Sequence, residues 1–201
     1  MRSSRWTIAA LGGLALVVRA SPAGAHLVST GLGPVYDGLI HFALAPEDLA
    51  PVLALGLLAG LRGPAHGRRT LFVLPAAWLL GGWLGLAVHA RAHPALTAIS
   101  FIFLGGLVAA DAPLSPAWIT VVAGLLGLGH GYLNGMALAP PGPGWLGLLG
   151  TTLAVFIIIA LTASFVLSLR PAWARVAVRV AGSWIAAIGL LLLGWGLRRS
   201  A

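Results

Sequence analysis

The sequence contains no cysteine and no lysine, and only four of its 201 residues are acidic. Without cysteine, the chain can form neither disulfide bonds nor metal sites built from thiolates. Charged residues make up 8% of the chain, whereas a soluble domain usually carries about 25%. A chain with so few charges cannot cover itself with a water-soluble surface. These scarcities exclude an ordinary soluble domain.

Apolar residues are abundant and occur in long, continuous runs. They make up 59% of the chain, and the mean hydropathy is +0.99. Continuous runs favour helices over a β-barrel, whose strands alternate apolar and polar residues. We therefore predict an all-α, polytopic membrane helix bundle of about six transmembrane helices. The expected spans lie near residues 49–61, 71–88, 95–111, 117–138, 145–169 and 176–197.

Residues 1–25 have the pattern of a cleavable signal peptide. Two arginines precede an apolar run over 7–18, and Ala23-Gly24-Ala25 supplies a small-residue cleavage site. The alternative is an uncleaved first span, but about a dozen apolar residues are fewer than the ~20 that crossing requires. We therefore expect the mature chain to begin at His26 and residues 26–201 to form a single transmembrane domain.

The twelve basic residues are all arginine, and their spacing indicates membrane orientation rather than nucleic-acid binding. They stand singly or in pairs between apolar runs, whereas nucleic-acid binding needs clustered cations on soluble structure. Arginines concentrate in cytoplasmic loops. This tendency predicts a multi-pass protein of the bacterial inner (plasma) membrane with both termini in the periplasm. The loops expected inside carry Arg62, Arg68, Arg69, Arg170, Arg175 and Arg179, and the outer side keeps Arg91, Arg198 and Arg199.

Three of the four acids gather with a histidine at the start of the first predicted span. They are Asp37, Glu47 and Asp48, and the histidine is His41. If this stretch is helical, Asp37 and His41 stand at positions i and i+4 on one face. A carboxylate and an imidazole so placed could share a divalent metal ion. The alternative is that Glu47 and Asp48 only stabilise the positive end of a helix.

Two further candidates are a histidine inside a predicted span and a histidine at the predicted mature N-terminus. His130 lies within the fourth span, with Asn134 one turn later and glycines around both. The pair could hold a metal in the membrane, or His130 could only hydrogen-bond across the bundle. His26 would offer an α-amine and an imidazole that chelate late first-row metals, unless the terminus is simply frayed.

Several of these motifs together resemble the HupE/UreJ family of hydrogenase and urease accessory membrane proteins. The likeness is most specific over residues 26–63 and continues in His130-Gly131-Tyr132. Better-known members have adjacent Asp and His in the first motif, whereas three residues separate Asp37 from His41 here. Their second motif carries another histidine and an acid where this chain has Asn134 and Ala137. The resemblance implies a divergent branch of a family regarded as nickel or cobalt permeases.

The interpretation that we favour is a non-enzymatic permease that passes a divalent transition metal inward and so supports metalloenzyme maturation. Nickel or cobalt would be cargo rather than a permanently bound cofactor, and the other partner is the lipid bilayer, with no nucleic acid. Periplasmic capture would involve His26, Asp37, His41, Glu47 and Asp48. His130 and Asn134 would form an inner station.

Two other classes of function stay open. The first class is a membrane redox carrier or enzyme. A haem-binding redox protein with two axial histidines would need a second deep histidine besides His130. A serine hydrolase would require a Gly-x-Ser-x-Gly motif, and none accompanies Ser164 or Ser183. A non-transporting accessory or metal-sensing subunit fits the same residues. The sequence also leaves open which metal is bound and whether the chain assembles as a homo-oligomer.

Overall fold

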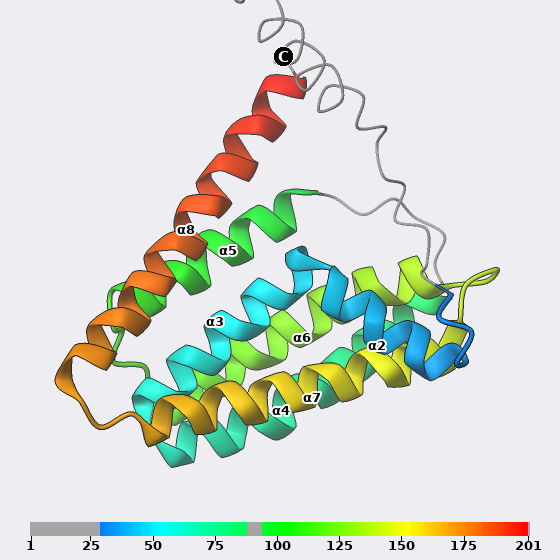
Figure 1. Cartoon of the computed structure of the whole chain (residues 1–201). Coiled ribbons are helices and arrows are strands. Elements are labelled where there is room, and N and C mark those ends of the chain that lie inside the picture. Colours follow the sequence, from blue (N-terminus) through cyan, green and yellow to red (C-terminus); the bar gives the residue numbers. More distant parts are fainter. Residues whose placement is uncertain (1–28, 88–93, 201) are drawn as a thin grey trace, which may run out of the picture.

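The computed structural model describes residues 29–87 and 94–200, and every element in this part of the chain is a helix. The predicted signal peptide over 1–25 and the predicted ligand His26 lie outside the described residues. Figure 1 shows the arrangement of the helices. They are α2 (Pro34–Leu44), α3 (Pro46–Arg62), α4 (Pro64–Leu86), α5 (Pro94–Ala109), α6 (Pro116–Leu138), α7 (Gly144–Ser168) and α8 (Ala172–Ser200).

Proline sets where the helices begin. Five of these helices start at a proline, which suits the first turn because its backbone has no N–H to leave unpaired and its φ is already helical. Ser115 adds a side-chain cap to α6 by accepting a hydrogen bond from the backbone N–H of Trp118 at 3.3 Å. The proline punctuation that divides the sequence into spans therefore also fixes the helix boundaries.

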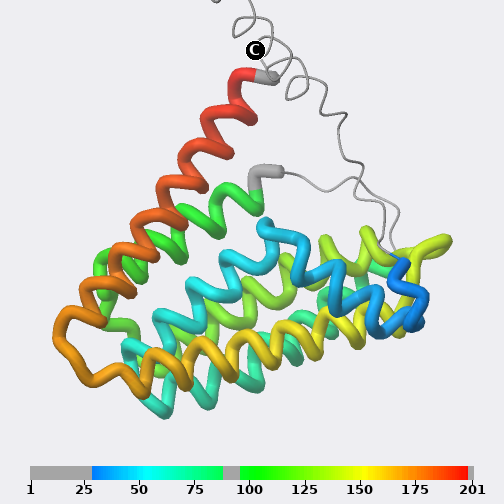
Figure 2. The backbone as a smooth tube through the Cα atoms, in the orientation of Figure 1, coloured from blue at the N-terminus to red at the C-terminus, as the bar shows by residue number. Residues whose placement is uncertain are grey.

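The first pass of the chain is a broken helix. α2 and α3 meet at Ala45 with a bend of 76° between their axes, and the break lies midway along the bundle, at its upper edge in Figure 2. Pro46 at the start of α3 cannot donate the hydrogen bond that would continue α2. The stretch that holds Asp37 and His41 is helix α2, so the two residues stand one turn apart on it. As a result, the positive end of α3 lies among the other helices.

The structure confirms an all-helical chain that is apolar enough to be a membrane protein. Among the described residues, α4, α6, α7 and α8 are each long and apolar enough to cross a bilayer, and the bent pair α2–α3 would count as a fifth span. The apolar helix α5 has 16 residues and falls below that length. The total of about six spans therefore stays a prediction.

Helices α4 and α6 pack with their backbones almost touching. At four positions along this interface, an added Cβ atom would lie 2.0–2.2 Å from a backbone oxygen of the other helix. Only glycine allows such an approach, which is a common way for membrane helices to associate. The four glycines are Gly81 and Gly85 on α4 and Gly131 and Gly135 on α6. This contact fixes the height and rotation of α6, the helix that carries His130.

Helices α5 and α8 form a pair that diverges from the other five helices (Figure 1). They pack through small residues, because a Cβ atom on Gly105 of α5 would lie 2.4 Å from the backbone nitrogen of Ala186 on α8. Only 17% of the most apolar part of α8 is buried within the chain. Most of α8 is therefore available to lipid, and α5 stands between α8 and the core.

Candidate functional site

The break between α2 and α3 places a buried carboxylate inside the bundle. Asp48, in the first turn of α3, is only 6% exposed. Its Oδ1 lies 2.8 Å from Nδ1 of His130, and its Oδ2 accepts a hydrogen bond of 2.7 Å from Nδ2 of Asn134. The positive end of α3 favours a negative charge at this position. Asp48 is therefore hydrogen-bonded to two side chains, those of His130 and Asn134, that lie more than 80 residues away in the sequence.

The imidazole of His130 is held on three sides. Its Nε2 lies 3.0 Å from Oγ of Ser100 on α5, and the Ser100 hydroxyl donates to the carbonyl of Thr97 at 2.8 Å. The indole of Trp78 on α4 stacks on the ring, with centroids 6.1 Å apart and planes 25° apart. These contacts orient both ring nitrogens. We call Asp48, Ser100, His130 and Asn134 the Asp48 network.

One atom of the network lacks a partner. Nδ2 of Asn134 donates both to Asp48 and to the carbonyl of His130, the latter at 3.2 Å. Because both neighbours are acceptors, the amide has to point its nitrogen at them. Its Oδ1 is then buried with no hydrogen-bond partner among the described residues. An unpaired buried acceptor costs about 1–3 kcal/mol, and a bound cation would remove that cost.

The network offers a small donor set for a transition-metal ion. A metal bound by one nitrogen and one oxygen at about 2.1 Å from each holds these two atoms about 3.0–3.4 Å apart, slightly more than the hydrogen-bonded 2.8 Å between Nδ1 of His130 and Oδ1 of Asp48. Oδ1 of Asn134 could add a third, neutral ligand. No cluster of three or more His, Asp or Glu residues occurs within 29–87 and 94–200.

The structure leaves three other predicted ligands outside the Asp48 network. Asp37, near the start of α2, accepts hydrogen bonds from the backbone N–H and the hydroxyl of Thr30 at 2.6 and 2.7 Å. His41 lies one turn later on α2 and is half-buried, and Glu47 is exposed beside a cavity that Trp195 also lines. Among the described residues, none of the three is hydrogen-bonded to a member of the Asp48 network. The predicted ligands that come together are Asp48, His130 and Asn134.

Ser100 and Trp78 were not among the residues singled out from the sequence. Both are buried, Trp78 completely, and both stand in apolar runs that read only as transmembrane helix. Trp78 also contacts Phe42 of α2 edge-on, with ring centroids 5.6 Å apart. A hydroxyl in an apolar span was the available signal for Ser100, but several other spans carry one too.

If His130 and Asp48 hold a metal ion, replacing Ser100 with alanine should weaken its binding by roughly 10- to 100-fold, the usual loss when a residue that orients a metal ligand is removed. Nε2 of His130 would lose its partner, and the ring could turn away from Asp48. Metal binding by calorimetry and the pH dependence of uptake would both be measured. Ser183→Ala is the matched control, because that hydroxyl bonds only to a carbonyl of its own helix. Equal affinity for Ser100→Ala and the unaltered protein would contradict the positioning role.

A family model described as HupE / UreJ protein matches residues 14–192. No curated protein and no solved structure gave a significant match. The matched range contains α2 to α7 and most of α8. All four members of the Asp48 network therefore lie within it.

Proposed function

This chain belongs to the HupE / UreJ protein family, and on that premise we propose that it is a permease for a divalent transition-metal cation. Nickel or cobalt is the proposed cargo, carried across a bacterial inner membrane toward the maturation of metalloenzymes. The observation that carries the proposal is the buried Asp48 carboxylate at a helix break, joined to His130 and to an amide whose oxygen has no partner.

A broken helix inside the bundle supports transport over static binding. Many transporters bind ions where a membrane helix is interrupted, because the free helix ends and nearby side chains can hold an ion partway across. Ionisable residues inside the membrane are costly and commonly mark ion paths. The 76° break lies next to Asp48, in the first turn of α3, and this supports the proposal.

The remaining predicted ligands fit an earlier stage of the same path. Asp37 and His41 lie on α2, which leads to the break from the end of the bundle opposite the arginine-rich loops (Figure 1). With the arginines on the cytoplasmic side, this end faces the periplasm. His26, Asp37, His41 and Glu47 are proposed to collect the cation there before it reaches Asp48, His130 and Asn134.

Proteoliposomes containing only this protein are expected to accumulate the metal when their interior is made negative. An inside-negative potential of 100 mV favours entry by about 2.3 kcal/mol per charge, and so by about 4.6 kcal/mol for a divalent cation. No nucleotide would be needed. Uptake of radioactive nickel or cobalt would be measured against protein-free liposomes. Binding without any uptake would overturn the permease and favour a non-transporting accessory or metal-sensing role.

The same vesicles would show which metal the site prefers. An imidazole beside oxygen ligands suits nickel, cobalt and zinc, whereas magnesium prefers oxygen ligands alone. Nickel, cobalt, zinc and iron would therefore be compared at equal concentration, with magnesium as the negative control. Nickel or cobalt is expected to enter fastest and magnesium not at all.

A further inference from the structure

One end of the bundle carries six of the twelve basic side chains of the chain. The end of α3, the start of α4, the α5–α6 loop and the start of α8 meet here, and Asp111 in the α5–α6 loop joins α3 to α8. Arg62 and Arg175 both form ion pairs with its carboxylate, and Arg179 donates to the carbonyl of Ala109 at the end of α5 at 2.9 Å. Arginines outnumber acids at this end. The arginines are Arg62, Arg68, Arg69, Arg170, Arg175 and Arg179.

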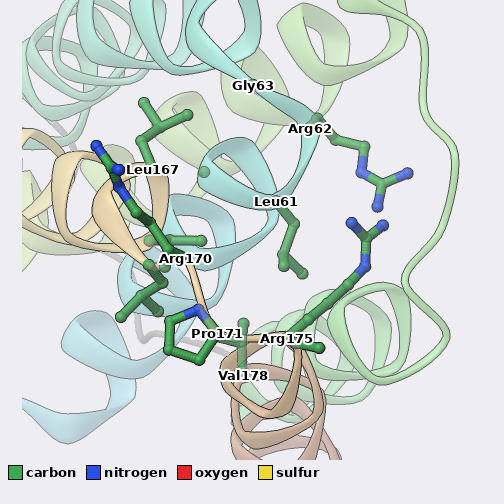
Figure 3. Close-up of a pocket in the computed structure, with 12 residues that line it drawn as sticks. Leu61, Arg62, Gly63, Leu167, Arg170, Pro171, Arg175 and Val178 are labelled. Atoms are coloured by element: carbon green, nitrogen blue, oxygen red, sulfur yellow. The ribbon is translucent and has the colours of Figure 1, made fainter.

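A cavity of about 480 Å³ opens among these connections, between the ends of α3 and α7 and the start of α8. Three arginines line it, together with an apolar wall that includes Leu61, Leu167 and Val178. Figure 3 shows the guanidinium groups of Arg62 and Arg175 turned toward one another, with that of Arg170 on the opposite side of the view. The cavity therefore combines cationic groups with a hydrophobic surface.

The positive charge of the cavity is only partly neutralised. Three arginines against the single aspartate leave a net charge of +2. Arg170 is exposed and makes no hydrogen bond or ion pair within the described part of the chain. Nε of Arg62 is buried without a partner as well. The positive end of the α8 helix dipole adds to the positive potential in the cavity, because no acidic residue in its first turn offsets it.

We propose that this cavity binds the phosphate group of an anionic membrane lipid. Arginine forks match phosphate oxygens and form strong, charge-assisted hydrogen bonds with them. The cavity lies at the ends of helices that are long and apolar enough to cross a bilayer, which would put it at the depth of the lipid headgroups, on the side that the arginines mark as cytoplasmic. Basic pockets between membrane helices on that side bind such headgroups. Leu61, Leu167 and Val178 would contact the first carbons of the acyl chains.

A free phosphate ion shares the same chemistry, but it would gain nothing from the apolar wall. The test therefore compares phosphatidylglycerol and cardiolipin with zwitterionic phosphatidylcholine and with inorganic phosphate. The full-length protein in a neutral detergent would be titrated with each, and its thermal unfolding midpoint recorded. Lipid phosphorus retained through purification gives a second readout that does not depend on unfolding. Both anionic lipids should raise the midpoint, and phosphatidylcholine should not.

Arg170→Gln is the decisive variant, because Arg170 has no structural partner to lose. It should bind the anionic lipids about fivefold more weakly, the effect of one arginine at a membrane surface. Arg69→Gln is the matched control: it is exposed at the same end, does not line the cavity and should bind normally. Equal weakening in both variants would show diffuse attraction and overturn the site. A midpoint shift as large with inorganic phosphate would overturn the lipid as its ligand, and no shift with any of them would overturn both.

Discussion

Replacing Asp48 with asparagine is expected to abolish metal uptake in proteoliposomes, reducing the initial rate by at least about 100-fold. That loss is at the upper end of the range seen when only a residue supporting a metal ligand is removed, and Asp48 is proposed as the ligand itself. It is the one carboxylate in its network. A neutral amide there would neither attract the cation nor balance its charge. Initial rates of nickel and cobalt uptake would be the measurement.

The neighbouring residue provides a close control. Glu47→Gln removes the same charge one position earlier in the chain, but Glu47 is exposed whereas Asp48 is buried. If Glu47 serves only in early capture, its loss should lower uptake a few-fold at low metal concentration and leave the maximal rate unchanged. Calorimetry of metal binding should show the site absent in Asp48→Asn and present in Glu47→Gln.

Two outcomes would argue against this assignment. The first is a folded Asp48→Asn protein, monodisperse on size exclusion, that transports at the normal rate. The second is an equal defect in both variants, which would place the effect in surface charge at the mouth of the path. Because aspartate and asparagine have nearly the same shape, a loss of uptake without a loss of folding assigns the function to the charge.

The helices were largely predictable, since hydropathy and proline mark them directly. The span expected over 117–138 is α6 (Pro116–Leu138), and the span expected over 145–169 is α7 (Gly144–Ser168). The break between α2 and α3 was not predicted. Proline at position 46 suits the first turn of a helix, but a local pattern cannot show whether the segment before it is a loop or a second helix packed against α7.

The candidate site was predictable in its residue types but not in its geometry. Scarcity of charge singled out Asp48 and His130, and helical spacing added Asn134. Spacing alone also paired Asp37 with His41, whereas Asp37 is bonded to Thr30 in the folded chain. Contacts across 82 residues depend on how far α6 is rotated and raised against its neighbours. That rotation is set by close contacts of glycines, whose significance is hidden in a sequence with 28 of them.

Replacing Gly131 with alanine should therefore damage both the fold and the site, although the change adds a single methyl group. The new carbon would lie 2.2 Å from the backbone oxygen of Trp78 and 2.8 Å from its carbonyl carbon. Backbone atoms cannot rotate away as a side chain can, so α4 and α6 must separate. Overpacking of this kind costs about 1–3 kcal/mol. The thermal unfolding midpoint in detergent should fall, and metal uptake should fall with it.

Gly124→Ala separates the effect of packing from the effect of the substitution itself. Gly124 lies on the same helix, and an added Cβ atom there would have nothing within 4 Å. Alanine should then stabilise α6, by up to about 1 kcal/mol from helix propensity, with uptake unchanged. A normal unfolding midpoint in Gly131→Ala would show that α4 and α6 can move apart at little cost. That result would contradict the claim that the contact between α4 and α6 positions the ligands. His130 on α6 is stacked on Trp78 of α4 and bonded to Asp48 of α3, so its place depends on how α6 packs.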